Sequence, residues 1–189
     1  MSALQELLKE RVNILLSSLE SFYTDKEKIE RIVSLMTVAL KQGNKLLFMA
    51  NGGAASTCEH LSAEFTGRFL KKRKGYPSIA LTANSADVTA IGNDFGFENI
   101  FSRQIEAFAK PGDVVIGMTT SGNSPNVVEG LKMARAMKVI SIVFTGNGGG
   151  EVAKYADYVL MGPSGTSGPI QEAHMILGHC ICHLVDEQL

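Results

Sequence analysis

The sequence predicts an α/β fold in which a five-stranded parallel sheet carries helices on both faces and two further helices precede it. The first observation behind this prediction is a series of short, continuous apolar runs, which is the pattern of parallel strands covered on both faces. The second is that helical segments alternate with these runs after residue 43. The third is composition, because 19 glycines with only 5 prolines suit tight strand-to-helix turns.

The predicted elements follow the apolar periodicity along the chain. Residues 2–21 and 25–42 are predicted as amphipathic helices, the second beginning with a capping box of Thr24 and Glu27 and ending at Gly43. The strands are predicted at residues 45–50, 78–82, 113–118, 139–145 and 158–161, and the later helices at residues 54–69, 86–92, 98–109, 124–137, 150–155 and 170–188.

The length of 189 residues suits a single domain, residues 1–189, with its own core. We assign residues 44–189 to the α/β core of this domain. The two helices within residues 1–43 carry apolar residues that are surplus to such a core. We therefore expect this helical pair to be used in oligomerisation.

Charge and cysteine content exclude several functional classes. Eighteen basic against 19 acidic residues give a net charge of -1, which offers no electrostatic basis for binding nucleic acid or an anionic membrane. We interpret the basic cluster at residues 68–74 as a solvated helix terminus. The three cysteines, Cys58, Cys180 and Cys182, have no CxxC spacing and are expected as buried free thiols. Because no segment has signal-peptide or spanning character, we expect a soluble cytoplasmic protein.

The loop after the third predicted strand is the most informative segment. It places four hydroxyl side chains around one glycine, and a helix is predicted to begin directly afterwards: Thr119, Thr120, Ser121, Gly122, Ser124. One such residue is enough to cap a helix, so four of them point to an anion site at the positive end of the helix dipole. Because the loop contains no Lys or Arg, its neutral donors favour a sugar phosphate over a nucleoside triphosphate.

Two weaker signals follow the first predicted strand. Gly52 and Gly53 let the backbone approach a ligand, but they do not form a G-x-G-x-x-G pattern, so we reject a dinucleotide site. His60 and Glu64 lie one turn apart on one helix face, which is a usable geometry for metal ligands and also a common surface pair.

Two further segments contain polar residues whose role the sequence alone does not decide. Asn93 and Asp94 are interpreted as a turn between helical segments. Three of the four histidines, His174, His179 and His183, lie in the last predicted helix, which invites a functional interpretation. We expect His183 to be simply exposed or interfacial.

Five elements together resemble the bacterial phosphoheptose isomerases of the sugar-isomerase (SIS) family. They are Asn51-Gly52-Gly53, His60-x-x-x-Glu64, Ala90-Ile91-Gly92-Asn93-Asp94-Phe95-Gly96, Thr120-Ser121-Gly122-Asn123-Ser124, and Ile170-Gln171-Glu172-Ala173-His174 with His179. The resemblance runs from about residue 20 to the C-terminus, in order and spacing. The Ser-Gly-Asn-Ser element by itself indicates only the flavodoxin-like SIS fold, whereas the His/Glu/Gln/His set is more specific.

The resemblance implies conversion of sedoheptulose 7-phosphate to D-glycero-D-manno-heptose 7-phosphate through an enediol, the first step of ADP- or GDP-heptose biosynthesis for lipopolysaccharide or capsule. It implies a homotetramer with active sites at subunit interfaces and one Zn²⁺ per subunit. The implied metal ligands are His60, Glu64, Gln171 and His179, and the implied proton-transfer pair is Glu64 and His179. The implied sugar-phosphate contacts are Asn51, Gly52, Gly53, Asn93, Asp94, Thr119, Thr120, Ser121, Ser124 and Gln171.

The spacing of the implied ligands raises a geometric question. Gln171 and His179 are eight residues apart, about 12 Å of rise on one straight helix, so both cannot easily reach one ion. Either Gln171 precedes the regular helix or the two ligands come from different chains, and we favour different chains. A carboxylate or imidazole bound to zinc is a poorer base, so we expect the ion to act as a Lewis acid while Glu64 or His179 leaves it during turnover.

Three residues depart from the family pattern. Ala50 and Ala54 stand where Gly and Ser are common, and Pro169 stands where Arg is common. The lost hydroxyl and charge leave a pentulose or hexulose phosphate as an alternative substrate. An alternative from another class is a non-catalytic SIS-domain protein that binds a sugar phosphate or a replication initiator. Such relatives often lose the final histidine of the set, so the presence of His179 favours the enzyme.

Overall fold

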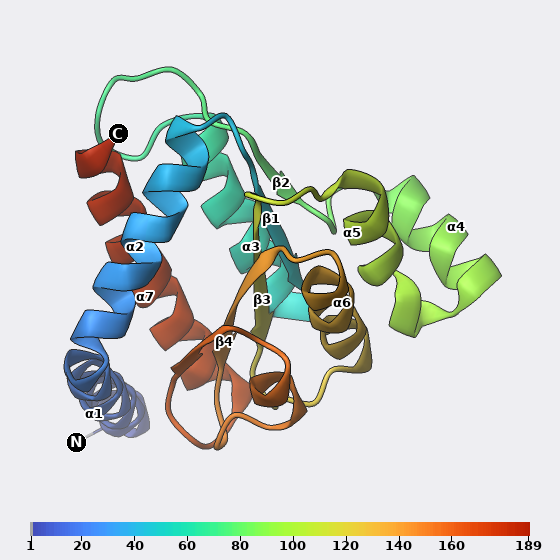
Figure 1. Cartoon of the computed structure of the whole chain (residues 1–189). Coiled ribbons are helices and arrows are strands. Elements are labelled where there is room, and N and C mark those ends of the chain that lie inside the picture. The colour runs from blue at the N-terminus through green and yellow to red at the C-terminus, as the bar shows by residue number, and fades with distance from the viewer. Residues whose placement is uncertain (1) are drawn as a thin grey trace.

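The central sheet has five parallel strands in the order β2-β1-β3-β4-β5 (Figure 1). In the computed structural model, which describes residues 2–189, the strands are β1 (Leu46–Ala50), β2 (Ser78–Ala80), β3 (Val114–Thr119), β4 (Ile140–Thr145) and β5 (Tyr158–Met161). Ala50 pairs with Met118, so the loops after β1 and β3 begin side by side. The strand order reverses between these two strands, and ligands of such sheets bind at the carboxyl ends beside this switch point.

Helices cover both faces of the sheet, which confirms the predicted fold class. They are α1 (Ala3–Thr24), α2 (Lys26–Lys41), α3 (Gly52–Thr66), α4 (Ser85–Phe95), α5 (Ser102–Phe108), α6 (Pro125–Ala136) and α7 (Ser167–Gln188), with the short 3-10 segments η1 (Phe97–Asn99) and η2 (Glu151–Lys154). Two apolar clusters fill the two faces: Leu46 and Phe48 point to the side of α2, α3 and α7, and Leu47 and Met49 to the side of α5 and α6.

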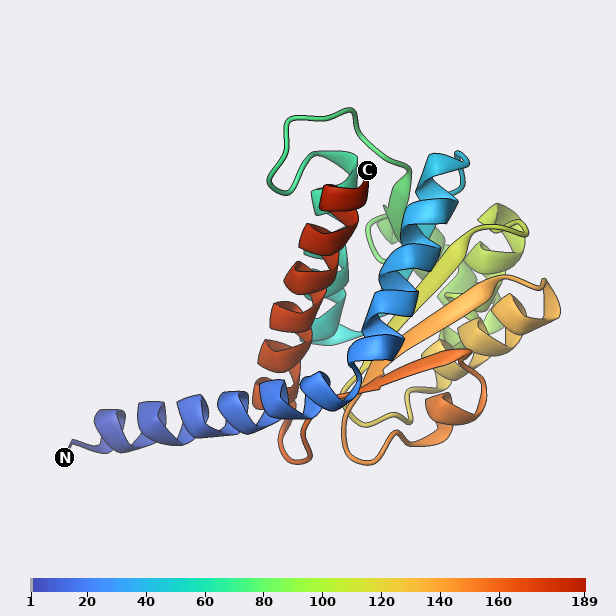
Figure 2. The same ribbon diagram turned by 60° about the vertical axis from the view of Figure 1, so that its left-hand side comes forward.

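The two N-terminal helices differ in their packing. Helix α2 buries Ile32, Val33 and Met36 in the core beside α7, so the expectation that both helices are surplus to the core is wrong for α2. Helix α1 projects from the body (Figure 2) and leaves an apolar stripe exposed: Leu4, Leu7, Leu8, Val12 and Leu16. The use of residues 1–43 in oligomerisation stays a prediction.

The predicted capping box of Thr24 and Glu27 is wrong. Helix α1 continues through Thr24, and the N-cap of α2 is Asp25, whose carboxylate accepts a hydrogen bond from Lys28 Nζ (2.7 Å). A capping box is found instead at α1, where the side chains of Ser2 and Gln5 each accept a hydrogen bond from the other's backbone N–H. Within residues 2–189, no helix is both long enough and apolar enough to cross a membrane.

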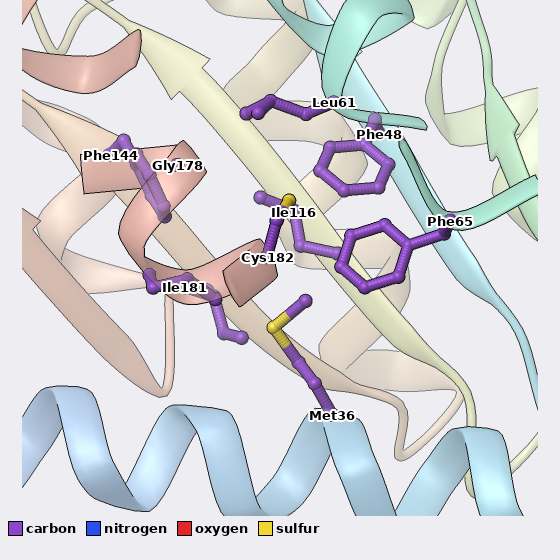
Figure 3. A pocket seen from close by; sticks show the side chains of 10 residues that line it. Met36, Phe48, Leu61, Phe65, Ile116, Phe144, Gly178, Ile181 and Cys182 are labelled. Carbon is purple, nitrogen blue, oxygen red and sulfur yellow. The ribbon is translucent and has the colours of Figure 1, made fainter. Parts of the chain in front are cut away.

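The cysteines are free thiols, and two of the three are buried. Cys182 lines a small apolar void of about 10 Å³ together with Met36, Phe48 and Phe65 (Figure 3). Burial raises the pKa of Cys182 to about 12 and raises the pKa of Cys58 even further, so both thiols are inert. Cys180 is exposed, so the expectation that all three are buried is wrong for this residue.

Candidate active site

A pocket of about 100 Å³ opens at the carboxyl ends of β1 and β3. We call it the hydroxyl pocket; it is lined by Asn51, Ala54, Met118, Thr119, Thr120, Ser121, Ser124 and Gln171. The loops after the two strands and the first turns of α7 meet there, at the switch point of the sheet. The structure therefore brings together the four hydroxyl residues predicted to surround an anion, with Asn51 and Gln171 beside them.

The hydroxyl groups contact one another. Thr119 Oγ1 lies 2.9 Å from Ser124 Oγ and 3.5 Å from Ser121 Oγ, and Thr120 Oγ1 lies 3.1 Å from Ser167 Oγ of α7. Ser124 is the N-cap residue of α6, yet its side chain caps none of the described backbone N–H groups. Its hydroxyl contacts Thr119 Oγ1 within the pocket and not the helix backbone, which supports an anion site rather than simple helix capping.

A pair of asparagines joins the two loops of the hydroxyl pocket. Asn51, at the start of α3, and the buried Asn126, in the first turn of α6, donate to each other's side-chain oxygens at 2.7 Å in both directions. The starts of α3 and α6 are thereby fixed relative to each other. Gly52 and Gly53 open α3, where the first backbone N–H groups of a helix have no intrahelical partner.

The loop after β3 depends on Gly122 and on a run of three glycines after β4 that the sequence motifs did not include. Gly122 has a φ of +71°, and a Cβ on it would lie 2.2 Å from the carbonyl oxygen of Gly149. The Val152 N–H donates to the Gly122 carbonyl at 2.9 Å, which ties the loop to η2. The run Gly148-Gly149-Gly150, all at positive φ, is the sequence signal for this close contact between two backbones.

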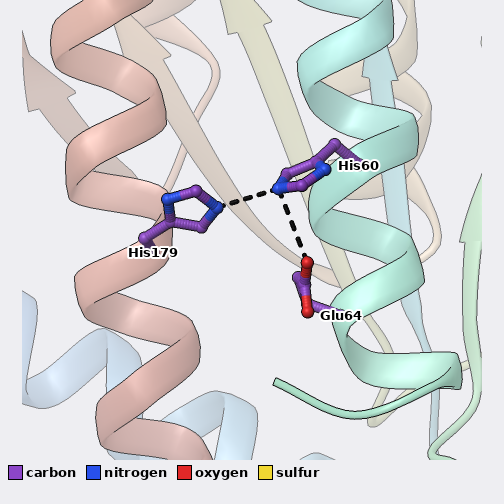
Figure 4. A group of neighbouring side chains, drawn as sticks. All are labelled: His60, Glu64 and His179. Carbon is purple, nitrogen blue, oxygen red and sulfur yellow. Dashed lines mark hydrogen bonds and ion pairs between the residues drawn. The ribbon is translucent and has the colours of Figure 1, made fainter. Parts of the chain in front are cut away.

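A second polar group lies between α3 and α7. His60, Glu64 and His179 have their ligand atoms within 4.8 Å of one another (Figure 4). His60 Nε2 lies 2.9 Å from His179 Nε2 and 3.5 Å from Glu64 Oε1. Two imidazole nitrogens and one carboxylate are suitable ligands for Zn²⁺. We call these three residues the ligand triad.

Gln171 does not lie with the ligand triad of its own chain. Helix α7 begins at Ser167, so the alternative that Gln171 precedes the regular helix is wrong. Its side chain lies against Gly53, where a Cβ would be 2.9 Å from Gln171 Oε1, and it lines the hydroxyl pocket. His179 is about 12 Å farther along the same helix. A fourth ligand from Gln171 of another chain stays a prediction.

The parallel packing of α3 and α7 aligns the two groups. Gln171 faces Gly53 near the start of both helices, and His179 faces His60 about two turns later. Beside the His60–His179 contact, a Cβ on Gly178 would lie 2.5 Å from Leu61 Cδ1, so the helices approach closely because position 178 is glycine. The hydroxyl pocket and the ligand triad therefore lie along one helix–helix interface.

Asn93 and Asp94 do not line the hydroxyl pocket. They are exposed in the last turn of α4, so their interpretation as a turn is wrong; the turn follows at Gly96, whose φ is +89°. Helix α4 lies at one side of the molecule (Figure 1), and none of its residues, all of which are described, is buried. A role of Asn93 and Asp94 in binding the substrate stays a prediction.

The remaining two histidines of α7 take no part in the ligand triad. His174 is 1% exposed and its Nε2 lies 3.1 Å from the Thr145 carbonyl oxygen. Burial lowers the pKa of His174 to about 4, against the opposite effect of that hydrogen bond, so the ring is neutral at physiological pH. His183 is exposed beside Glu187, which confirms the expectation for this residue.

Comparisons with known proteins find similarity over nearly the whole chain. A family model of the SIS domain matches residues 11–146. The chain is 45% identical over 185 residues to a phosphoheptose isomerase of Aquifex aeolicus, covering 98% of this chain and 95% of that protein. It is 47% identical over 162 residues to a probable phosphoheptose isomerase of Thermoplasma acidophilum, covering 86% and 89%. Its fold is similar to that of a phosphoheptose isomerase from Neisseria gonorrhoeae, with a TM-score of 0.89, 34% identity and coverage of 98% and 100%.

Proposed function

The chain belongs to the SIS-domain family of phosphoheptose isomerases, and on this premise we propose that it converts sedoheptulose 7-phosphate to D-glycero-D-manno-heptose 7-phosphate. The observation that carries the proposal is the alignment of the hydroxyl pocket and the ligand triad along α3 and α7. The reaction needs an anion site at one end of a long sugar and acid–base groups at the other. In this proposal the hydroxyl pocket is the anion site and the ligand triad supplies the acid–base groups, about 12 Å farther along the helices.

The hydroxyl pocket is the proposed seat of the phosphate. Its donors are neutral hydroxyl groups and backbone N–H groups at helix starts, which suit a phosphate monoester. The proposed contacts are Asn51, Gly52, Gly53, Thr119, Thr120, Ser121, Ser124 and Gln171. Asn93 and Asp94 complete the set in this proposal, and because they lie on the exposed helix α4 we assign them to the substrate bound by a neighbouring chain.

Glu64 and His179 are the proposed proton-transfer pair. Isomerisation takes a proton from one of the carbons C1 and C2 and returns one to the other through a cis-enediol. A base must lie beside these carbons, and the charge that develops on the neighbouring oxygens must be stabilised. A sugar held by its phosphate in the hydroxyl pocket and extended along α3 and α7 presents its other end to this pair.

The donor set of the ligand triad fits zinc, and we propose one Zn²⁺ per subunit with Gln171 of a neighbouring chain as the fourth ligand. When bound, the ion supplies Lewis-acid polarisation of the oxygens on C1 and C2. Glu64 and His179 would then have two roles, holding the ion and carrying the proton between C1 and C2. An active site shared between chains agrees with a homotetramer, for which the exposed apolar stripe of α1 offers surface.

We propose that the reaction takes place in the cytoplasm and is the first step of heptose biosynthesis for lipopolysaccharide or capsule.

The direct test of the proposed activity is turnover of sedoheptulose 7-phosphate before and after treatment with a zinc chelator, followed by added zinc. We expect activity to be lost on chelation and restored by zinc. His179→Gln should lower kcat by about 10²-fold or more. His183→Gln, an exposed position on the same helix, is the matched control and should retain activity. Absence of turnover from a protein that sugar phosphates still stabilise would indicate a non-catalytic binding protein.

A further inference from the structure

The segment of residues 67–77, which joins α3 to β2, passes over the C-terminal end of α7 (Figures 1 and 2). We call it the strap. It contains the basic cluster that the sequence analysis interpreted as a solvated helix terminus. That interpretation is wrong for Arg73, whose side chain is 11% exposed and pairs with Asp186 of α7, whose side chain is 1% exposed.

Asp186 holds the strap through its backbone as well as through Arg73. Its carboxylate accepts hydrogen bonds from the N–H groups of Leu70 (3.2 Å) and Lys71 (2.8 Å) and from Arg73 Nε. Burial by itself raises the pKa of Asp186, but these donors hold that pKa below its usual value, so the carboxylate is ionised. A single buried carboxylate thus binds three residues of the strap.

Arg73 in turn holds the end of α3 that carries Glu64. Its Nη2 donates to the Glu64 carbonyl oxygen at 2.8 Å, and its Nη1 donates to the Phe65 carbonyl oxygen at 3.0 Å. The last carbonyl groups of a helix lack intrahelical partners, and a cation there also complements the helix dipole. The guanidinium group therefore fixes the backbone of a ligand-triad residue without contacting its side chain.

The strap also carries a ring that packs on the other side of the ligand triad. Phe69 stacks on His179, with ring centroids 5.4 Å apart and an interplanar angle of 25°. This contact holds the imidazole plane, and with it the direction of His179 Nε2 toward His60 Nε2 at 2.9 Å. The strap therefore contacts the ligand triad at two points, the Glu64 backbone through Arg73 and the His179 ring through Phe69.

We propose that Arg73 and Asp186 are a positioning pair for the ligand triad, acting through the strap and Phe69. Neither residue touches the triad side chains. The pair holds the strap against the C-terminal end of α7. Phe69 therefore stays stacked on His179, and the last turn of α3, which carries Glu64, keeps its position. The catalytic consequence rests on the proposed function, whereas the geometric claim concerns the metal-free chain and stands apart from it.

The geometric claim is tested by nitrogen-15 NMR of the histidine side chains in the metal-free protein at a pH above 7. The two Nε2 atoms lie at hydrogen-bond distance, so one must donate and the other accept, and the Glu64 carboxylate 3.5 Å from His60 Nε2 favours the proton on that atom. His60 should therefore be protonated at Nε2 and His179 at Nδ1. Phe69→Leu and Arg73→Lys should each convert His179 to averaged tautomers. Arg103→Lys, which alters an exposed ion pair with Glu106, is the matched control and should leave the spectrum unchanged.

A second measurement follows metal affinity, with Co²⁺ as the probe. We expect Phe69→Leu and Arg73→Lys to weaken Co²⁺ binding at least tenfold while the thermal stabilisation by inorganic phosphate is unchanged, because neither residue lines the hydroxyl pocket. In turnover, kcat should fall more than KM rises. If Arg73→Lys does not fold, Phe69→Leu decides, since it removes no charge. Wild-type tautomers and Co²⁺ affinity in Phe69→Leu would overturn the proposal, even if the wild-type protein had no isomerase activity.

Discussion

Leu61 of α3 and Gly178 of α7 are in direct contact, and a Cβ on Gly178 would lie 2.5 Å from Leu61 Cδ1. This contact sets the spacing of the two helices at the level of His60 and His179, the next residues of the same interface. The ligand triad therefore depends on a glycine that has no ligand role. The close approach is a property of the helix pair, since the backbone of Gly178 itself is ordinary helix.

The first prediction concerns this contact. Gly178→Ala should displace the Leu61 side chain, lower the free energy of unfolding by about 1–3 kcal/mol and weaken binding of Zn²⁺. Gly92→Ala on α4 is the matched control, because its Cβ would meet only Ile100 Cγ2 at an ordinary 3.7 Å, and it should be stabilising by about 0.5–1 kcal/mol. Chemical denaturation and zinc titration measure both effects. Equal behaviour of the two variants would contradict this role of Gly178.

The second prediction concerns the loop of the hydroxyl pocket. Gly122→Ala places a Cβ 2.2 Å from the Gly149 carbonyl oxygen at a positive φ, so the loop must move away from η2. We expect KM for the sugar phosphate to rise at least tenfold and the stabilisation by inorganic phosphate to be lost, while Co²⁺ still binds the ligand triad. Gly148→Ala is the control, because it has a similar positive φ of +78° but a Cβ there would meet nothing within 4 Å. An unchanged KM in Gly122→Ala would argue against a phosphate seat there.

The third prediction tests whether the Gln171 and His179 of one active site belong to the same chain or to two chains. Gln171→Ala and His179→Ala should each be inactive, and the two proteins are then dissociated and reassembled together. If one active site takes its ligands Gln171 and His179 from different chains, mixed oligomers contain some sites with a complete ligand set that lack only the Gln171 contact of their own hydroxyl pocket, and part of the activity returns. If both residues act within one chain, each site in the mixture stays defective. Recovery of activity is the outcome we expect, and its absence in proven mixed oligomers would refute the shared site.

The fourth prediction uses the buried His174. Its pKa is about 4 in the folded chain, whereas an unfolded histidine has a pKa of about 6.5. Between these pH values the unfolded chain binds a proton that the folded chain does not. The free energy of unfolding should therefore fall as the pH falls, by up to about 1.4 kcal/mol per pH unit from this group.

His174→Gln isolates that contribution, because glutamine retains a donor for the Thr145 carbonyl oxygen and does not titrate. Urea denaturation at pH 7.5, 6 and 5 should show a shallower loss of stability for the variant than for the wild-type protein. The other histidines and the carboxylates are common to both proteins, so they cancel in the difference. Parallel pH profiles would show that folding does not lower the pKa of His174.

Features set by local sequence were predictable. Continuous apolar runs predicted the five strands, and the four hydroxyl residues around Gly122 predicted the hydroxyl pocket, because a short loop after one strand keeps them together. The three residues of the ligand triad were predicted from the resemblance to the family. The capping box was predicted at the wrong helix, because α1 continues through Thr24 and leaves Asp25 as the only link to α2.

Features set by contacts distant in sequence were not predictable in this way. His60 and His179 are 119 residues apart, and their meeting depends on the register of α3 against α7. The basic cluster of the strap did not reveal that Arg73 alone turns inward, because its partner Asp186 lies on another helix. Helix α4 continues through Gly92, where a glycine costs only about 1 kcal/mol, so Asn93 and Asp94 are helical.

The central claim is that the hydroxyl pocket and the ligand triad form one isomerase site. The most direct measurement is turnover of sedoheptulose 7-phosphate by the zinc-loaded protein in D₂O, with Glu64→Gln in parallel. The account predicts an aldoheptose phosphate that carries solvent deuterium at a carbon of the C1–C2 pair, and a loss of both product and exchange in Glu64→Gln. Absence of product and exchange from a folded, zinc-loaded protein that inorganic phosphate still stabilises would contradict it.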